Sequence, residues 1–145
     1  MTRAEPDERT DVLARSVIGA AIEVHRALGP GFLEEVYENA LAIEMRSRKI
    51  PFERQKGFRV DYKGDLVGEG RMDFFVGSCL VVELKAVQVL AAVHTAQVIS
   101  YLKATGLTLG LLINFNVSLL KQGIRRVVLT PSPNNQPLAS LAPWR

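Results

Sequence analysis

The sequence predicts an α/β domain with α+β character, in which helices flank a mixed sheet of four or five strands. Two helical patterns come first, three strand-like segments follow one another, and a third helix separates them from two more strands. Three consecutive strands favour an antiparallel meander. The helix after them is long enough for a crossover, which favours a parallel pairing for the fourth strand.

The three helices are predicted from apolar spacing and stop signals. Apolar residues recur at helical spacing over residues 10–28, and the Gly-Pro-Gly sequence at 29–31 ends that helix. A second helix is predicted over residues 32–48. The third covers residues 91–104 and ends at Gly106.

The strands are predicted from alternation and from short apolar runs. Residues 53–62 alternate polar with apolar side chains, and residues 66–76 form a second strand after a turn. The run at 79–87 is nearly continuous in apolar residues, which is typical of a buried central strand. Residues 107–115 and 124–129 complete the sheet.

The composition indicates one globular domain. The chain has 145 residues, of which 48% are hydrophobic and 23% are charged, which suits a single core. We predict one domain over residues 1–129 and a proline-rich tail over residues 130–145. The absence of a signal-like apolar region or a membrane-length apolar run predicts a soluble, cytoplasmic protein.

The net charge and the numbers of cysteine and histidine limit the kinds of partner and metal site that the chain can have. The net charge of +3 favours a polyanionic partner only mildly. One cysteine and two histidines exclude a zinc-type ligand cluster, so any metal would be bound by oxygen. The cysteine, Cys79, is interpreted as a small core residue.

An acid and a lysine interrupt the third strand. Side chains alternate along a strand, so Glu83 and Lys85 share one face and Leu84 points to the other. Burying both charged groups is costly unless they pair or bind an ion. A structural Glu83–Lys85 ion pair and a functional site are equally consistent with these two residues alone.

The second helix adds a third acid. On its helical wheel, Leu41 and Met45 lie on either side of Glu34, and Leu33 and Tyr37 lie on the same side. Glu34 is therefore expected to point inward. An Mg²⁺ ion shared with acids from the strands would compensate this charge, because Mg²⁺ binds carboxylates and water.

The crossover helix carries polar groups at one edge of its inward stripe. His94, Gln97 and Tyr101 lie close together on the wheel. We interpret His94 as a surface residue and assign Gln97 and Tyr101 to the candidate site, against the alternative that Tyr101 is a core aromatic.

Together these residues resemble a known family. Asp73, nine intervening residues and then Glu83-Leu84-Lys85 resemble the motif of the PD-(D/E)XK nuclease superfamily, with Met72 in place of its proline. Residues 31–37 match the Gly-x-x-Glu-x-x-Tyr signature of a small prokaryotic group within it. Gln97 and Tyr101 resemble the Gln-x-x-x-Tyr motif of one large branch. The resemblance covers residues 12–129 and implies a restriction-endonuclease-like αβββαβ core.

The resemblance implies Mg²⁺- or Mn²⁺-dependent hydrolysis of phosphodiester bonds. Asp73, Glu83 and Glu34 would hold metal, with the backbone carbonyl of Leu84 as a further ligand. Lys85 would orient water or stabilise charge, and the substrate-binding residues would be Gln97 and Tyr101. The expected partner is nucleic acid, with DNA favoured over RNA and no membrane. A homodimer stays an open alternative.

Two other functions are kept beside the nuclease. One is a catalytically silent nucleic-acid-binding or assembly module with the same fold, and the other is a hydrolase of small phosphorylated compounds. Five basic residues are candidates for backbone phosphate contacts, although each is also consistent with a solvated surface: Arg46, Arg48, Arg54, Lys56 and Arg59.

A shared metal also sets a condition on strand register. A two-residue hairpin loop at Gly77-Ser78 would pair Asp73 with Val82 and turn Glu83 to the other face. A three-residue loop through Cys79, or a bulge, would place Asp73 and Glu83 on one face. We predict the odd loop or the bulge.

Overall fold

The computed structural model describes residues 7–130, and within them it has three α-helices, one short 3₁₀ helix and a five-stranded sheet. Each predicted helix and strand is present, with bounds that differ from the predicted ones by a few residues. The elements are α1 (Glu8–Leu28), α2 (Glu34–Ser47), β1 (Phe52–Tyr62), β2 (Asp65–Val76), β3 (Leu80–Lys85), α3 (Ala92–Thr105), β4 (Leu109–Asn114), η1 (Leu120–Gly123) and β5 (Ile124–Val128). The predicted tail at 130–145 lies outside the described residues except for Thr130.

Local signals in the sequence fix the ends of α1. The Asp7 side chain accepts a hydrogen bond of 2.8 Å from the Thr10 N–H, which satisfies one of the free donors of the first turn. At the other end, Gly29 has a φ of 71° and its N–H binds the carbonyl of His25. Only glycine adopts this conformation without strain, so the chain can turn here toward α2.

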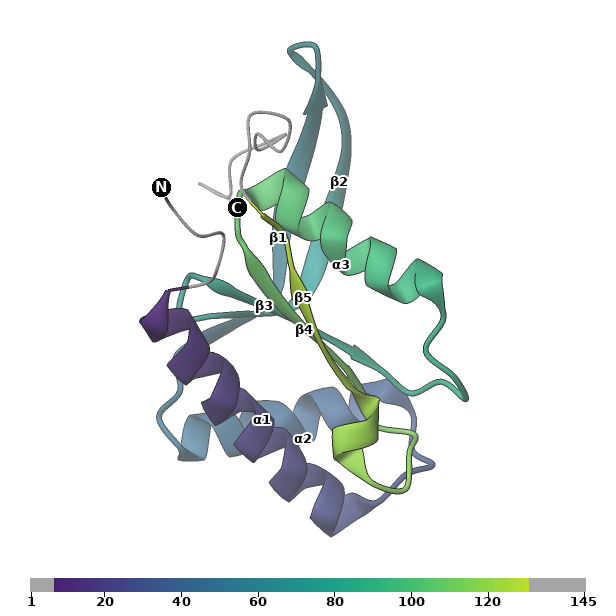
Figure 1. Ribbon diagram of the computed structural model, residues 1–145. Helices are drawn as coiled ribbons and strands as arrows, with labels where there is room; N and C mark the ends of the chain where they lie inside the picture. Colours follow the sequence, from purple (N-terminus) through teal and green to yellow (C-terminus); the bar gives the residue numbers. More distant parts are fainter. Residues whose placement is uncertain (1–6, 131–145) are drawn as a thin grey trace.

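The five strands lie in the order β1-β2-β3-β4-β5, and only β3 and β4 are parallel among the described strand pairs. The meander and the crossover through α3 are thus confirmed. Figure 1 shows α1 and α2 on one side of the sheet and α3 on the other. Two separate apolar clusters fill these two layers. The fold is that of a restriction-endonuclease-like α/β domain.

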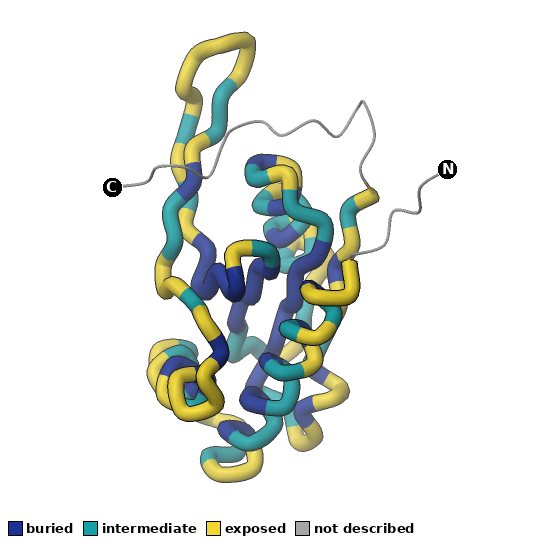
Figure 2. Tube along the Cα trace, turned by 90° about the vertical axis from the view of Figure 1, so that its left-hand side faces the viewer, coloured by how far each residue is buried: buried dark blue, intermediate teal, exposed yellow. Residues whose placement is uncertain are grey.

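The β1–β2 hairpin is much longer than the other strand pairs. It reaches beyond the edge of α3 (Figure 1), and its tip is exposed to solvent (Figure 2). The ladder shifts its register once, where Val60 pairs with Gly68 and Asp61 pairs with Leu66. The base of this hairpin, at the body of the domain, carries Asp73.

The β2–β3 connection has the predicted odd loop. Val76 pairs with Leu80, so three residues form the turn and Phe74 lies opposite Val82. Continuing this register places Asp73 opposite Glu83, on the same face. The interpretation of Cys79 as a core residue was wrong: it lies in this turn, is only partly buried and accepts a contact of 3.2 Å from Arg9.

The side chains of β1 and β2 exchange faces at one position. Phe52 and Phe74 pack in the cluster under α1 and α2, whereas Phe58 and Met72 pack in the cluster under α3. In a regular strand, residues separated by an even number share one face. The exchange occurs around Asp73, next to Gln55 of β1, which has a positive φ. It directs Asp73 into the opening between β2 and β3.

Candidate active site

Asp73 and Glu83 meet where the β2–β3 ladder ends. The last backbone pair is Phe74 with Val82. Beyond it, the Leu84 N–H donates to Asp73 Oδ2 at 2.8 Å, and the Asp73 N–H donates to Glu83 Oε1 at 3.2 Å. The two carboxylates therefore replace the ladder bonds that the diverging strands cannot make. Both residues are almost fully buried.

Burial and mutual repulsion disfavour ionisation of this pair. Burial raises the pKa of Glu83 to about 8, with a further contribution from the negative charge of Asp73. Burial also raises the pKa of Asp73, although the Leu84 N–H opposes the rise. The protein thus keeps two oxygen ligands close together without a cationic partner of its own that would fully compensate them.

Lys85 stands on the same strand as Glu83, with one residue between them. Burial raises the pKa of Glu83, Asp73 and Glu34, and the positive charge of Lys85 opposes part of each rise, so Lys85 lies within electrostatic reach of all three acids. Within residues 7–130, however, no ion pair joins Lys85 to Glu83. This part of the chain therefore does not contain the alternative considered above, a structural Glu83–Lys85 ion pair.

Glu34 is the first residue of α2. It is half-buried, and burial and the charge of Asp73 raise its pKa. The inward side of α2 is as predicted for Tyr37, Leu41 and Met45, which are fully buried. The prediction for Leu33 was wrong: it precedes the helix, and 80% of it is exposed.

Tyr37 holds the loop that leads to Glu34. Its hydroxyl donates to the Gly29 carbonyl at 2.6 Å and accepts from the Phe32 N–H at 3.1 Å. Its ring stacks on Phe115 at a centroid distance of 4.6 Å. Within residues 31–37, Tyr37 thus fixes the turn that directly precedes Glu34.

We expect Tyr37→Phe to lower the free energy of unfolding by about 1 kcal/mol, because two hydrogen bonds at a partly exposed loop are lost. If the site cleaves phosphodiester bonds, the cleavage rate should fall further than this loss of stability explains, by roughly tenfold, since the turn before Glu34 loses its hydrogen bonds to Tyr37. Urea denaturation and a cleavage assay measure the two effects. Tyr62→Phe, at the exposed hairpin tip, is the matched control, and equal activity of both variants would contradict the positioning role.

Sequence reasoning missed an outer group of polar residues around Asp73. The Gln55 side-chain amide donates to Asp73 Oδ1 at 3.3 Å and to both carboxylate oxygens of Glu38. Arg54 forms an ion pair of 3.0 Å with Glu38 and also donates to Asn39. The helical wheel put Glu38 at the edge of the inward face, which was the one available signal; nothing in the sequence pointed to Gln55.

The α3 helix carries Gln97 and Tyr101 on the side of the sheet opposite to α2 (Figure 1), within electrostatic reach of Glu83. Gln97 donates to the Tyr101 hydroxyl at 2.8 Å, and the Tyr101 ring packs edge-on against Phe58. Burial and the charge of Glu83 raise the pKa of Tyr101 to about 12. His94 is apart from this group, as its ring nitrogen accepts from the Ala91 N–H at the start of α3.

Residues 53–57 of β1 and residues 69–71 of β2 line a groove of about 470 Å³, and one of them, Gln55, binds Asp73. Of the five basic residues predicted as phosphate contacts, three are ion-paired within the protein: Arg48 with Glu44, Arg54 with Glu38 and Lys56 with Glu53. A fourth, Arg46, lies over the Phe52 ring. Such pairs are weak at a surface, so these side chains can exchange partners.

The donor set suits a hard cation that keeps part of its water shell. Between residues 7 and 130, no three acidic, histidine or cysteine side chains converge closely enough to hold an ion alone. Asp73 and Glu83 offer two adjacent carboxylates, and each carboxylate oxygen has lone pairs beyond the bonds described. Mg²⁺ is typically held by one or two carboxylates together with water and substrate phosphates. The residues therefore fit Mg²⁺.

Comparison with known proteins gives one match. A sequence model of the PD-(D/E)XK nuclease superfamily matches residues 11–127, a segment that contains every residue of the candidate site. No curated protein and no solved structure is significantly similar to the chain. No helix among residues 7–130 has the length and apolar character needed to cross a membrane.

Proposed function

Because this chain belongs to the PD-(D/E)XK nuclease superfamily, we propose that it is a Mg²⁺-dependent nuclease that hydrolyses phosphodiester bonds of nucleic acid, with DNA preferred. One observation carries the proposal. At the open end of the ladder, the Glu83 carboxylate accepts from the Asp73 N–H and the Asp73 carboxylate accepts from the Leu84 N–H, so the two acids meet between the strands. Burying two repelling acids is costly for the fold, and a cation bound between them would offset that cost.

We assign each site residue a role from its position. Asp73 and Glu83 would hold the metal, with Glu34 and the Leu84 carbonyl as further ligands, directly or through water. A bound Mg²⁺ supplies charge neutralisation and a more acidic water. Mn²⁺ is the expected substitute. Lys85 lies on the face of Glu83 and stabilises the negative charge that develops on the scissile phosphate.

Gln97 and Tyr101 are proposed to position the substrate. The Tyr101 hydroxyl already accepts a hydrogen bond from Gln97, so its own proton is free to donate to an anionic oxygen. Its raised pKa keeps that proton in place at neutral pH. A phosphate next to the metal would be such an acceptor.

We also propose that the chain belongs to the group marked by Gly-x-x-Glu-x-x-Tyr. The supporting observation is that the tyrosine of residues 31–37 has a specific role: Tyr37 binds the turn before Glu34 through both its donor and its acceptor. A chance match would not require these bonds. Burial raises the pKa of Glu34, and the charge of Asp73 adds to this rise.

The proposed function is tested with single-stranded, duplex and branched oligonucleotides, with and without Mg²⁺ or Mn²⁺. We expect metal-dependent cleavage by the wild type. Lys85→Met should lower the cleavage rate by roughly 10²- to 10³-fold, since it removes a preorganised positive charge. Its Mn²⁺ affinity should be unchanged or higher, because a cation near the site has been removed.

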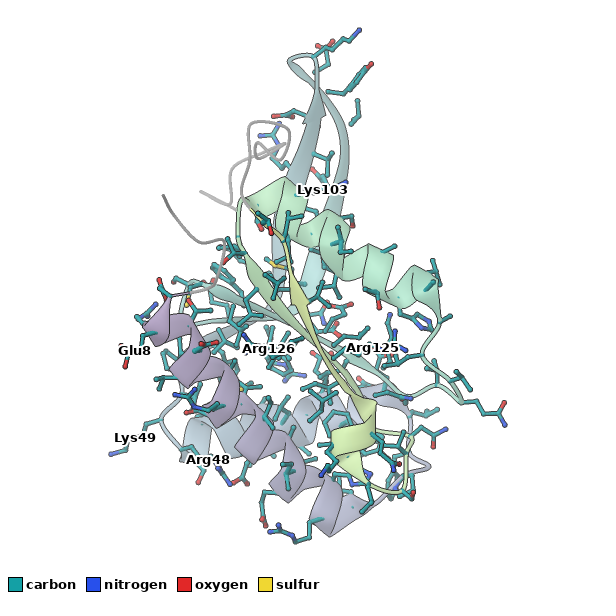
Figure 3. All side chains as sticks on the ribbon, in the orientation of Figure 1. Glu8, Arg48, Lys49, Lys103, Arg125 and Arg126 are labelled. Atoms are coloured by element: carbon teal, nitrogen blue, oxygen red, sulfur yellow. The ribbon has the colours of Figure 1, made fainter. Side chains whose placement is uncertain are left out.

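Lys103→Met is the matched control, since Lys103 is exposed on α3 (Figure 3). It should cleave like the wild type. Binding of oligonucleotides without cleavage under any metal condition would favour the silent binding or assembly module. A wild-type cleavage rate in Lys85→Met would show that Lys85 has no role in the reaction.

A further inference from the structure

Gln55 combines three unusual properties at one position of β1. Its backbone φ is 51°, in the left-handed region. It stands where β1 and β2 exchange faces, between Arg54 and Lys56, whose partners Phe74 and Met72 flank Asp73. Its side-chain amide donates to Asp73 at 3.3 Å and to Glu38 at 3.1 and 3.2 Å.

The conformation is costly for glutamine and has no local explanation in packing. A residue with a side chain rarely adopts a positive φ, and when it does inside a strand the surroundings usually enforce it. Gln55 is exposed, so no apolar core selects its side chain. Glycine would adopt this backbone without strain. What the glutamine adds over glycine is its amide and the contacts that the amide makes.

Those contacts link two carboxylates that repel one another. The charge of Glu38 contributes to the raised pKa of Asp73, whereas the hydrogen bond from Gln55 acts in the opposite direction. The amide has two N–H donors and no charge. It can therefore bind a carboxylate on each side. A lysine or arginine at this position would form an ion pair with these carboxylates, and its positive charge would compete with a metal ion.

We propose that Gln55 is a positioning residue of the metal site: its neutral amide holds the Asp73 carboxylate in place and ties it to Glu38 on α2. The inference rests on the proposed function, because it concerns the affinity of the same site for its metal. It assigns the strained backbone of β1 to metal binding rather than to stability.

Gln55→Gly separates these two roles, because it removes the amide and relieves the backbone. We expect the free energy of unfolding of the metal-free protein to stay equal or rise. We expect the Mn²⁺ dissociation constant, measured calorimetrically without nucleic acid, to increase about 10- to 100-fold, as for other groups that orient a metal ligand. Stability thus stays equal or rises, while the affinity for Mn²⁺ falls.

Lys49→Gly is the matched control. Lys49 also has a positive φ, of 60°, and its side chain points away from the protein (Figure 3). This variant should gain stability without a change in Mn²⁺ affinity. A wild-type affinity in Gln55→Gly, or a clear loss of its stability, would overturn the positioning role. Absence of Mn²⁺ binding by the wild type would instead contradict the proposed function itself.

Discussion

Glu83→Ala is expected to abolish metal-dependent cleavage, with a loss of at least about 10³-fold. The variant removes one of the two adjacent carboxylates, and a bound metal contributes several kcal/mol of charge stabilisation in the transition state. Asp73→Ala should have the same effect. Cleavage in Mg²⁺ and in Mn²⁺, with the Mn²⁺ dissociation constant of each variant, measures the loss.

The same variant should leave the metal-free fold intact. Glu83 is buried beside Asp73, and its charged form is disfavoured, so its removal relieves repulsion, although the Asp73 N–H loses an acceptor. The free energy of unfolding should stay unchanged or rise. Glu35→Ala is the control, since Glu35 is an exposed acid next to Glu34. A marked loss of stability in Glu83→Ala alone would show that Glu83 is a structural residue.

Much of this site could be predicted because its parts follow the regular periods of helices and strands. The shared face of Glu83 and Lys85 follows from strand alternation, and the inward direction of Glu34 follows from the helical wheel. The odd β2–β3 loop was predicted from chemistry, as Asp73 and Glu83 can share a cation only on one face. The observed pair of Val76 with Leu80 agrees with it.

The rest depends on departures from those periods. A glutamine in a strand-like sequence does not indicate a positive φ, so the exchange of faces at Gln55 had no signal in the sequence. The alternation of β1 and β2 was therefore read as continuous, whereas Phe52 and Phe58 lie in different layers. Leu33 was placed on a helix that begins one residue later. Such positions are decided by tertiary contacts, not by local pattern.

The metal-free protein is expected to lose stability as the pH rises from about 4.5 to about 8. Glu83 has a pKa of about 8 in the folded state and an ordinary value of 4.5. Between these values the unfolded chain releases the proton that the folded protein keeps, so the unfolded state binds fewer protons and the free energy of unfolding falls with pH. The total loss is of the order of a few kcal/mol and is complete above the folded pKa.

Metal should reverse this dependence, because Mg²⁺ binds the ionised carboxylates and competes with the proton. At saturating Mg²⁺ the stabilisation over the metal-free protein should grow as the pH rises through the same window. Urea denaturation at pH 5, 6, 7 and 8, with and without Mg²⁺, measures both trends. Glu83→Gln carries no titrating group at this position, so the difference between it and the wild type isolates the contribution of Glu83. A metal-free wild type whose stability relative to Glu83→Gln stays constant from pH 5 to pH 8 would show that Glu83 is ionised in the folded protein, and that the buried pair is already compensated from within the chain.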